Sequence, residues 1–225
     1  GLYGERLRLS ASQVDKAASC RFAYFMRYGL RARERKEITV DPAEFGTFVH
    51  YILEHTARDV CEAGGFSRVS LERTQELAME YAGRYRREYF AGLGERTSRQ
   101  DYLLERNLQE LRAVVRELWE ELAQSRFQPA GFEVQFGPGG AMPPVEIPGG
   151  AMPAQLRGFV DRLDLYERDG QTYVRVVDYK TGRKDFDYCD VLNGLGLQML
   201  LYLFALEDHG RAYLGVSAEA AGVLY

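Results

Sequence analysis

The chain has 225 residues, of which 46% are hydrophobic and 28% charged, an ordinary composition for a soluble globular protein. Its formal net charge of −4 excludes a basic footprint over the whole chain, and no apolar run approaches the roughly 20 residues that cross a bilayer. The three cysteines are too few and too scattered for a disulfide framework, and the first residues lack the apolar stretch of a signal peptide, so we expect a cytoplasmic protein without a membrane anchor.

The N-terminal part begins with a helix signal. Ser10 and Gln13 have the spacing of a capping box, which predicts a helix that runs to about Tyr28. A charged linker over residues 31–39 follows, and its basic side chains are typical of a solvated surface.

Three more helices are predicted before residue 130. Asp41 as a cap and Pro42 in the first turn mark the start of a helix that ends near Glu62. Apolar residues at helical spacing predict two longer helices near residues 70–92 and 98–125.

The C-terminal part mixes strands and helices. A short strand is expected at residues 132–136, followed by a glycine- and proline-rich loop or wide hairpin over 137–155. An apolar helix over 190–208 should be closed by Gly210, and a last strand should occupy 221–225.

The segment 156–183 contains the acidic and basic residues that indicate a reaction. It is expected to form two strands joined by a two-residue type I′ turn at residues 169–170. That turn places Asp161 opposite Asp178, and Lys180 shares their face because side chains alternate along a strand. Since facing carboxylates repel each other, the pattern indicates a bound divalent cation and metal-assisted phosphodiester hydrolysis.

The opposite face of this hairpin supports the same register. It pairs Asp164 with Arg175 and Tyr166 with Tyr173, and both are favourable cross-strand neighbours. A three-residue turn or a bulge would shift the register and separate the two aspartates, which would then be ordinary charges at strand ends.

Other polar residues are ambiguous when taken alone. His50 lies mid-helix, one turn after Gly46, where a histidine is more often a core or rim residue than a ligand. Gln198 and Tyr202 are one turn apart on an apolar helix, which fits either a helix–helix polar contact or an active-site role. Cys20 by itself cannot form a metal site.

Five segments in a fixed order provide a family resemblance. They resemble the RecB-like branch of the PD-(D/E)XK nuclease superfamily, and in particular the nuclease domain of AddB-type proteins in bacterial helicase–nuclease complexes. Within the first segment, Arg21 stands where the CPF signature of the family has proline. The segments are 9–31, 44–54, 158–164, 176–183 and 194–202.

The resemblance implies a metal-ligand set. Asp161 and Asp178 would be the acidic ligands, with the backbone carbonyl of Tyr179 and the side chain of His50 as further ligands. The implied cation is Mg²⁺, for which Mn²⁺ is expected to substitute.

The resemblance also implies roles around the metal. Lys180 would orient the attacking water and stabilise charge that develops on the phosphate. Gln198 and Tyr202 match the Q-x-x-x-Y motif, which lies near the catalytic centre of the family.

The implied fold is α/β, a restriction-endonuclease-like core with a small mixed sheet flanked by helices and an added N-terminal helical part. We expect one nuclease domain over 1–225, in which 1–130 is mainly helical and 131–225 is the sheet core with the active site.

The chain would be a fragment of a longer protein. It would act as a metal-dependent DNA exonuclease domain in a bacterial ATP-dependent helicase–nuclease complex that processes double-strand breaks for recombination. Its partners would be single-stranded DNA and the partner subunit of that complex.

Cys20 corresponds to the first of four cysteines that hold a 4Fe–4S cluster in AddB-type nucleases. Cys61 and Cys189 do not fit that pattern, and the chain reaches Tyr225 before the other three positions. We therefore expect a cluster in the full-length protein and none that is complete in this chain.

Two alternatives remain at this point. One is a stand-alone PD-(D/E)XK exonuclease of the CRISPR-adaptation or phage type. The other is a non-catalytic module that guides a strand or docks another protein of the complex.

Overall fold

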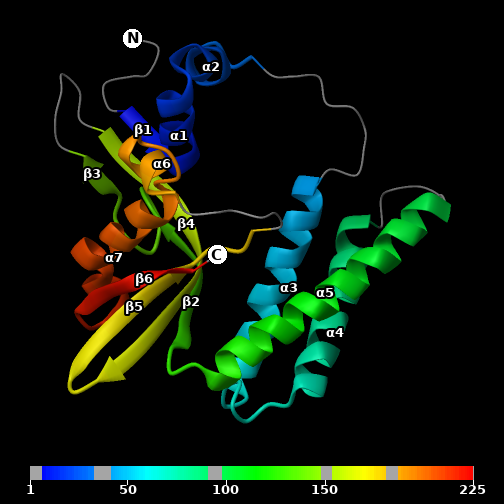
Figure 1. Cartoon of the computed structure of the whole chain (residues 1–225). Helices are drawn as coiled ribbons and strands as arrows, with labels where there is room; N and C mark the ends of the chain where they lie inside the picture. The colour runs from blue at the N-terminus through cyan, green and yellow to red at the C-terminus, as the bar shows by residue number, and fades with distance from the viewer. Residues whose placement is uncertain (1–6, 33–41, 91–97, 148–153, 181–186, 225) are drawn as a thin grey trace. The chain divides into compact units, whose positions relative to one another are not determined.

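The computed structural model describes residues 7–32, 42–90, 98–147, 154–180 and 187–224 (Figure 1). The chain divides into a sheet unit, residues 1–38 with 130–225, and a helical unit, residues 39–129. Most of the charged linker predicted at 31–39, together with the cap Asp41, lies outside the described residues. No helix in the described ranges has the length and apolar character needed to span a bilayer.

The helical unit consists of the three helices that the sequence predicts: α3 (Pro42–Glu62), α4 (Leu71–Phe90) and α5 (Ser98–Gln124). Helix α4 packs against both of the others. Helix α3 ends shortly before two glycines with left-handed φ angles of 109° and 92°, a conformation that other residues rarely adopt. Apolar side chains at helical spacing fill the core between the helices, including Ile52, Leu53, Val60, Leu111, Val115 and Leu122.

The sheet unit contains a six-stranded mixed sheet, which confirms the predicted α/β fold class. The long strand β4 (Ala154–Arg168) is central: it pairs in parallel with β1 (Leu7–Ser10) and antiparallel with β3 (Val145–Ile147) and β5 (Gln171–Val177). It also pairs with β2 (Gln128–Phe136), and β6 (Ala218–Leu224) extends the sheet in parallel beyond β5.

Helices α1 (Ala11–Ser19) and α7 (Gln198–Leu214) pack on this sheet. Ala11 from α1 and Met199 and Leu203 from α7 join the same buried cluster as Leu163 and Val176 of the hairpin. Helix α1, from the N-terminal part of the chain, therefore contributes to the core of the sheet unit.

The hairpin between β4 and β5 has the predicted two-residue turn. Asp169 and Gly170 both have left-handed φ angles, 53° and 78°, as a type I′ turn requires. The ladder runs in the predicted register as far as the pair Arg162 and Val177, so the three-residue alternative is wrong. Continuing the same register by one step brings Asp161 level with Asp178.

The cross-strand pairs predicted for the outer face of the hairpin are also present. The Arg175 Nε donates to Asp164 Oδ2 at 2.7 Å. The rings of Tyr166 and Tyr173 stack with their centroids 6.1 Å apart.

The N-terminal helix is shorter than predicted. The Ser10–Gln13 capping box is present, but α1 ends at Ser19 because Cys20 adopts an extended conformation with φ −160° and ψ 107°. A second short helix, α2 (Arg21–Tyr24), and a π-helical turn, η1 (Phe25–Gly29), follow. Strand β1, which was not predicted, forms because β4 offers it a partner more than 140 residues away in the sequence.

The helix predicted at 190–208 is two helices. Helix α6 (Tyr188–Leu192) is separated from α7 by Gly194 and Gly196, whose φ angles of 79° and 65° interrupt helical geometry. Gly210 lies inside α7, so the prediction that it closes the helix is wrong; Gly215 closes it with φ 74°. The last strand begins at Ala218, earlier than predicted, and Tyr225 lies outside the described residues.

The glycine- and proline-rich segment at 137–155 is partly ordered into the sheet. Met142 is only 1% exposed, and its N–H donates to the Gln135 carbonyl at 3.1 Å. Residues Val145–Ile147 form β3, while residues 148–153 lie outside the described part. Burial of Met142 and pairing of β3 anchor a segment that composition alone assigns to a loop.

Candidate active site

The end of the β4–β5 hairpin carries two buried aspartates. Asp161 lies within β4 and is 8% exposed, whereas Asp178 follows β5 directly and is 2% exposed. The N–H of Tyr179 donates to Asp161 Oδ2 at 2.7 Å, and the N–H of Asp178 donates to the Leu224 carbonyl at 3.0 Å. These two bonds connect the residues after β5 to β4 on one side and to β6 on the other.

Lys180 and Gln198 both contact the Asp178 carboxylate. The Lys180 Nζ lies 2.5 Å from Oδ2, and the Gln198 Nε2 donates to Oδ1 at 3.4 Å. Gln198 is the first residue of α7, so the positive end of this helix lies near the carboxylate. Two residues that the sequence placed near the catalytic centre, one from the hairpin and one from a helix, thus meet at one aspartate.

Tyr202 fixes the position of Gln198. The same Gln198 amide nitrogen donates to the Tyr202 hydroxyl at 3.1 Å. Burial raises the pKa of Tyr202 to about 12, with the negative charges of Asp178 and Asp161 acting in the same direction, so the phenol is neutral at physiological pH. The Q-x-x-x-Y motif therefore contacts Asp178 through the neutral Gln198 amide, which also donates to the neutral Tyr202 phenol.

Gly158 gives Tyr202 the space that this arrangement needs. A Cβ at position 158 would lie 2.7 Å from the Tyr202 hydroxyl oxygen and 2.8 Å from Phe136. The glycine that opens the GFVDRLD segment is thus required by a helix that comes about 40 residues later in the chain.

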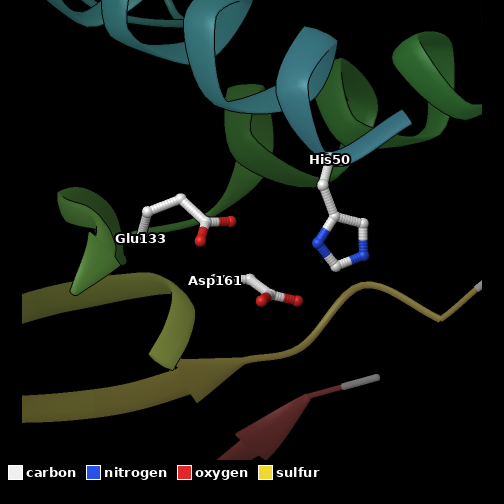
Figure 2. Close-up of side chains that lie close together, drawn as sticks. All are labelled: His50, Glu133 and Asp161. Atoms are coloured by element: carbon white, nitrogen blue, oxygen red, sulfur yellow. The ribbon is translucent and has the colours of Figure 1, made fainter. Parts of the chain in front are cut away.

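Glu133 is a neighbour of Asp161 that sequence reasoning missed. A carboxylate oxygen of Glu133 lies within 4.8 Å of one from Asp161, and Figure 2 shows the two groups close together. Glu133 has a left-handed φ of 48° within β2, between the buried Phe132 and Val134. A non-glycine residue rarely adopts this conformation. The sequence carries no sign of it, because a glutamate between two buried residues is what a half-exposed strand ordinarily shows.

The donor atoms suit a hard divalent cation. The carboxylates of Asp161, Asp178 and Glu133 supply only oxygen, which Mg²⁺ prefers. Two of these groups are nearly buried, and both act on the Tyr202 phenol, so they are close enough to influence the same hydroxyl. Lys180 provides a positive charge beside Asp178, and a divalent cation would favour the ionised form of all three carboxyl groups.

His50 and Cys20 come from other helical segments of the chain. His50 is half-buried in α3, in the helical unit, with Gly46 one turn before it. Cys20 is exposed at the break between α1 and α2, where its Sγ accepts the N–H of Ala23 at 3.4 Å. Within the described ranges, Cys20 belongs to no group of three or more side chains that could hold a metal ion.

Comparison with known families agrees with this geometry. The family model of the PD-(D/E)XK nuclease superfamily matches residues 8–225, and the chain belongs to that superfamily. This result confirms the resemblance on which the predicted fold rests.

The names of individual relatives indicate a more specific class of nuclease. The chain is 35% identical to a protein of Clostridium novyi and 36% identical to one of Caldanaerobacter subterraneus, and both carry the name of a subunit of an ATP-dependent helicase/deoxyribonuclease. A protein of Moorella thermoacetica with the same name is also 35% identical. Each alignment covers the whole of this chain but only 19% or 20% of the relative, so the chain spans about one fifth of the length of these proteins.

Proposed function

We propose that this chain is the nuclease domain of a bacterial ATP-dependent helicase–nuclease, and that it hydrolyses DNA phosphodiester bonds with the help of Mg²⁺. The observation that carries the proposal is the pair of buried aspartates at the end of one hairpin, Asp161 and Asp178, with Lys180 on the Asp178 carboxylate, within a chain of the PD-(D/E)XK nuclease superfamily. The names of the relatives support DNA as the substrate and a helicase–nuclease as the setting.

The proposed cation ligands come from both strands of the hairpin. Asp161 and Asp178 would hold Mg²⁺ with their carboxylates, and Tyr179 with its backbone carbonyl. Glu133 supplies a further oxygen close to Asp161. We include His50 as a ligand because of the family resemblance of its helix segment. Bound Mg²⁺ supplies a Lewis acid that polarises the phosphate and lowers the pKa of water.

Lys180 would act directly on the reacting groups. Its ammonium group, held beside Asp178, can orient a water molecule toward phosphorus and offset negative charge on the phosphate oxygens. Gln198 and Tyr202 are positioning residues in this scheme, because their hydrogen bonds end on the Asp178 carboxylate and on each other.

The finer proposal is an exonuclease that receives a single strand from a helicase motor during double-strand-break processing in the cytoplasm. In that setting, other parts of the complex would supply most of the grip on DNA, which is consistent with the net charge of −4. Cys20 would contribute to an iron–sulfur cluster only together with cysteines from outside this chain.

The test is cleavage of end-labelled single-stranded DNA by the purified chain, with Mg²⁺ or with EDTA. We expect cleavage only with Mg²⁺, and its loss in Asp178→Ala and Lys180→Ala. The exposed Asp190 and the half-buried Lys16 provide matched control variants, Asp190→Ala and Lys16→Ala, which should cleave normally. Full activity in Asp178→Ala or Lys180→Ala would refute the proposal. DNA binding without any metal-dependent cleavage would indicate a strand-guiding module instead.

A further inference from the structure

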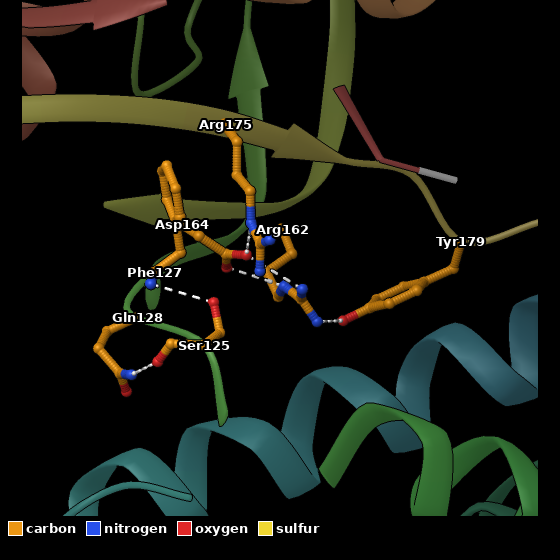
Figure 3. A network of polar contacts seen from close by, with 7 residues as sticks. All are labelled: Ser125, Phe127, Gln128, Arg162, Asp164, Arg175 and Tyr179. Atoms are coloured by element: carbon orange, nitrogen blue, oxygen red, sulfur yellow. Dashed lines mark hydrogen bonds and ion pairs between the residues drawn. The ribbon is translucent and has the colours of Figure 1, made fainter. Parts of the chain in front are cut away.

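A buried charged network lies on the face of the hairpin opposite Leu163 (Figure 3). Arg162 and Asp164 are both 0% exposed. Arg162 pairs with Asp164 through two contacts, Nε to Oδ1 at 2.8 Å and an Nη to Oδ2 at 3.0 Å. The Arg175 Nε donates to the same Oδ2 at 2.7 Å. One carboxylate therefore receives two guanidinium groups.

The network extends to Tyr179. The second Nη of Arg162 donates to the Tyr179 hydroxyl at 3.0 Å, and its guanidinium carbon lies 5.6 Å from the centre of the Tyr179 ring. On its main-chain side, the N–H of Tyr179 donates to Asp161 Oδ2. Tyr179 is thus held at its hydroxyl, at its ring and at its backbone.

The position of Tyr179 matters because the strand has already ended. Strand β5 stops at Val177, so residues 178–180 lie beyond its ladder with β4. Side chains of an extended chain alternate, and the side chains before and after Tyr179, those of Asp178 and Lys180, therefore point to the other face. Whatever fixes Tyr179 also sets the direction of these two side chains and of the carbonyl between them.

Energetics argue that the network does more than stabilise the fold. Removing charges from water costs several kcal/mol per ion, and a buried pair is often no more stabilising than well-packed apolar residues. Here two guanidinium groups share one carboxylate, and both Arg162 and Asp164 are removed from water. Fixing the geometry of a neighbouring site is a role that apolar side chains could not fill as specifically, because they lack directional hydrogen bonds.

We propose that Arg162, Asp164 and Tyr179 form a positioning network that aligns the Tyr179 backbone, and through it Asp178 and Lys180, for metal binding. The proposal rests on the proposed function, because it assigns the network to the same metal site. Tyr179 would thereby have two roles: its carbonyl would be a metal ligand, and its side chain is anchored on the opposite side of the sheet.

The test compares Tyr179→Phe with Tyr173→Phe in the purified chain. Tyr179→Phe removes only the hydroxyl that Arg162 contacts, whereas Tyr173→Phe removes a hydroxyl within β5, next to Tyr166. Binding of Mn²⁺ is measured by electron paramagnetic resonance without DNA, and thermal unfolding is measured in parallel. We expect Tyr179→Phe to bind Mn²⁺ about 10-fold more weakly, since outer-shell partners of metal ligands have effects of this size. Its Tm should stay near that of the wild type, and Tyr173→Phe should bind Mn²⁺ normally.

Unchanged Mn²⁺ affinity in Tyr179→Phe would overturn the positioning role. A lower affinity that merely accompanies a large loss of Tm would also overturn it, because it would show a structural role alone. Arg162→Lys is a second variant that tests the network. Lysine keeps the positive charge but lacks the planar group that contacts both Asp164 and Tyr179. The Arg162→Lys protein should therefore bind Mn²⁺ as weakly as Tyr179→Phe.

The two proposals can fail separately. If the wild-type chain binds Mn²⁺ no better than Asp178→Asn, the proposed metal site itself is refuted. If the wild type binds Mn²⁺, Asp178→Asn does not, and both network variants bind it normally, only the positioning network is refuted.

Discussion

On one face of the β4–β5 hairpin, the buried Asp164 forms ion pairs with Arg162 and Arg175. On the other face lie Asp161 and Asp178, with the Lys180 ammonium group beside Asp178. The charged groups of the first face are paired with one another. On the second face, a carboxylate oxygen of Glu133 lies close to Asp161. The same two strands thus hold one charge cluster that is built from ion pairs and another at which we propose that a cation binds.

The largest expected difference between the faces is in stability. Asp164→Ala leaves two guanidinium groups without their shared carboxylate, and we expect it to lower the free energy of unfolding by about 3–5 kcal/mol. Asp178→Ala relieves repulsion between carboxylates and should change this free energy by less than about 1 kcal/mol. Urea unfolding of both variants without metal would measure the contrast, and equal losses would mean that the two faces do not differ in this way.

Alkaline pH should ionise two tyrosines, one near each face of the β4–β5 hairpin. Burial is the main cause that raises the pKa of Tyr202 and of Tyr179 from 10.0 to about 12. The pKa of each phenol is higher in the folded state than in the unfolded state. The stabilising contribution of the neutral phenol is therefore fully present below pH 10 and is lost as the pH rises toward 12. A shift of this size corresponds to roughly 2–3 kcal/mol per group.

Tyr202→Phe and Tyr179→Phe should therefore each flatten the fall in stability between pH 10 and pH 12. Chemical unfolding at several pH values in this range would show the effect. An unchanged pH dependence in either variant would mean that the corresponding phenol is not shielded from solvent.

A smaller effect is expected from packing behind the acidic face. Gly158→Ala places a methyl group against Tyr202 and Phe136, and overpacking of this kind costs about 1–3 kcal/mol. Because Tyr202 would move, Gln198 should lose its position and DNA cleavage should fall as well. Gly83→Ala is the control: a Cβ there meets only an Arg87 Nη at 3.5 Å, and alanine favours the helix. If Gly158→Ala were as stable and as active as the wild type, Tyr202 would have room to shift without disturbing the site.

The features that could be predicted from the sequence are those that neighbouring residues in the chain determine. The turn at Asp169 and Gly170 could be predicted because a dipeptide determines its type, and strand alternation then fixes which side chains face each other. The Ser10–Gln13 capping box could be predicted for the same reason. The hairpin reasoning therefore led to both aspartates and Lys180 without any family resemblance.

What the sequence could not predict depends on distant partners or unusual backbone conformations. Arg162 resembles an ordinary strand residue until the structure places Asp164 and Tyr179 around its guanidinium group. Glu133 approaches Asp161 from another strand with a left-handed backbone that no pattern signals. The break between α6 and α7 was missed because Gly194 and Gly196 lie in a run whose apolar spacing suits one continuous helix.

The hydrogen bond from the Asp178 amide to the Leu224 carbonyl has a practical consequence. It ties the backbone of a proposed metal ligand to the last described residue of β6, so the amide proton of Asp178 should be protected from solvent only while that strand is docked. Hydrogen–deuterium exchange at this single amide would therefore report fraying of the final strand, and would show whether lengthening the polypeptide after Tyr225 loosens or tightens the end of the sheet that carries the proposed metal ligands.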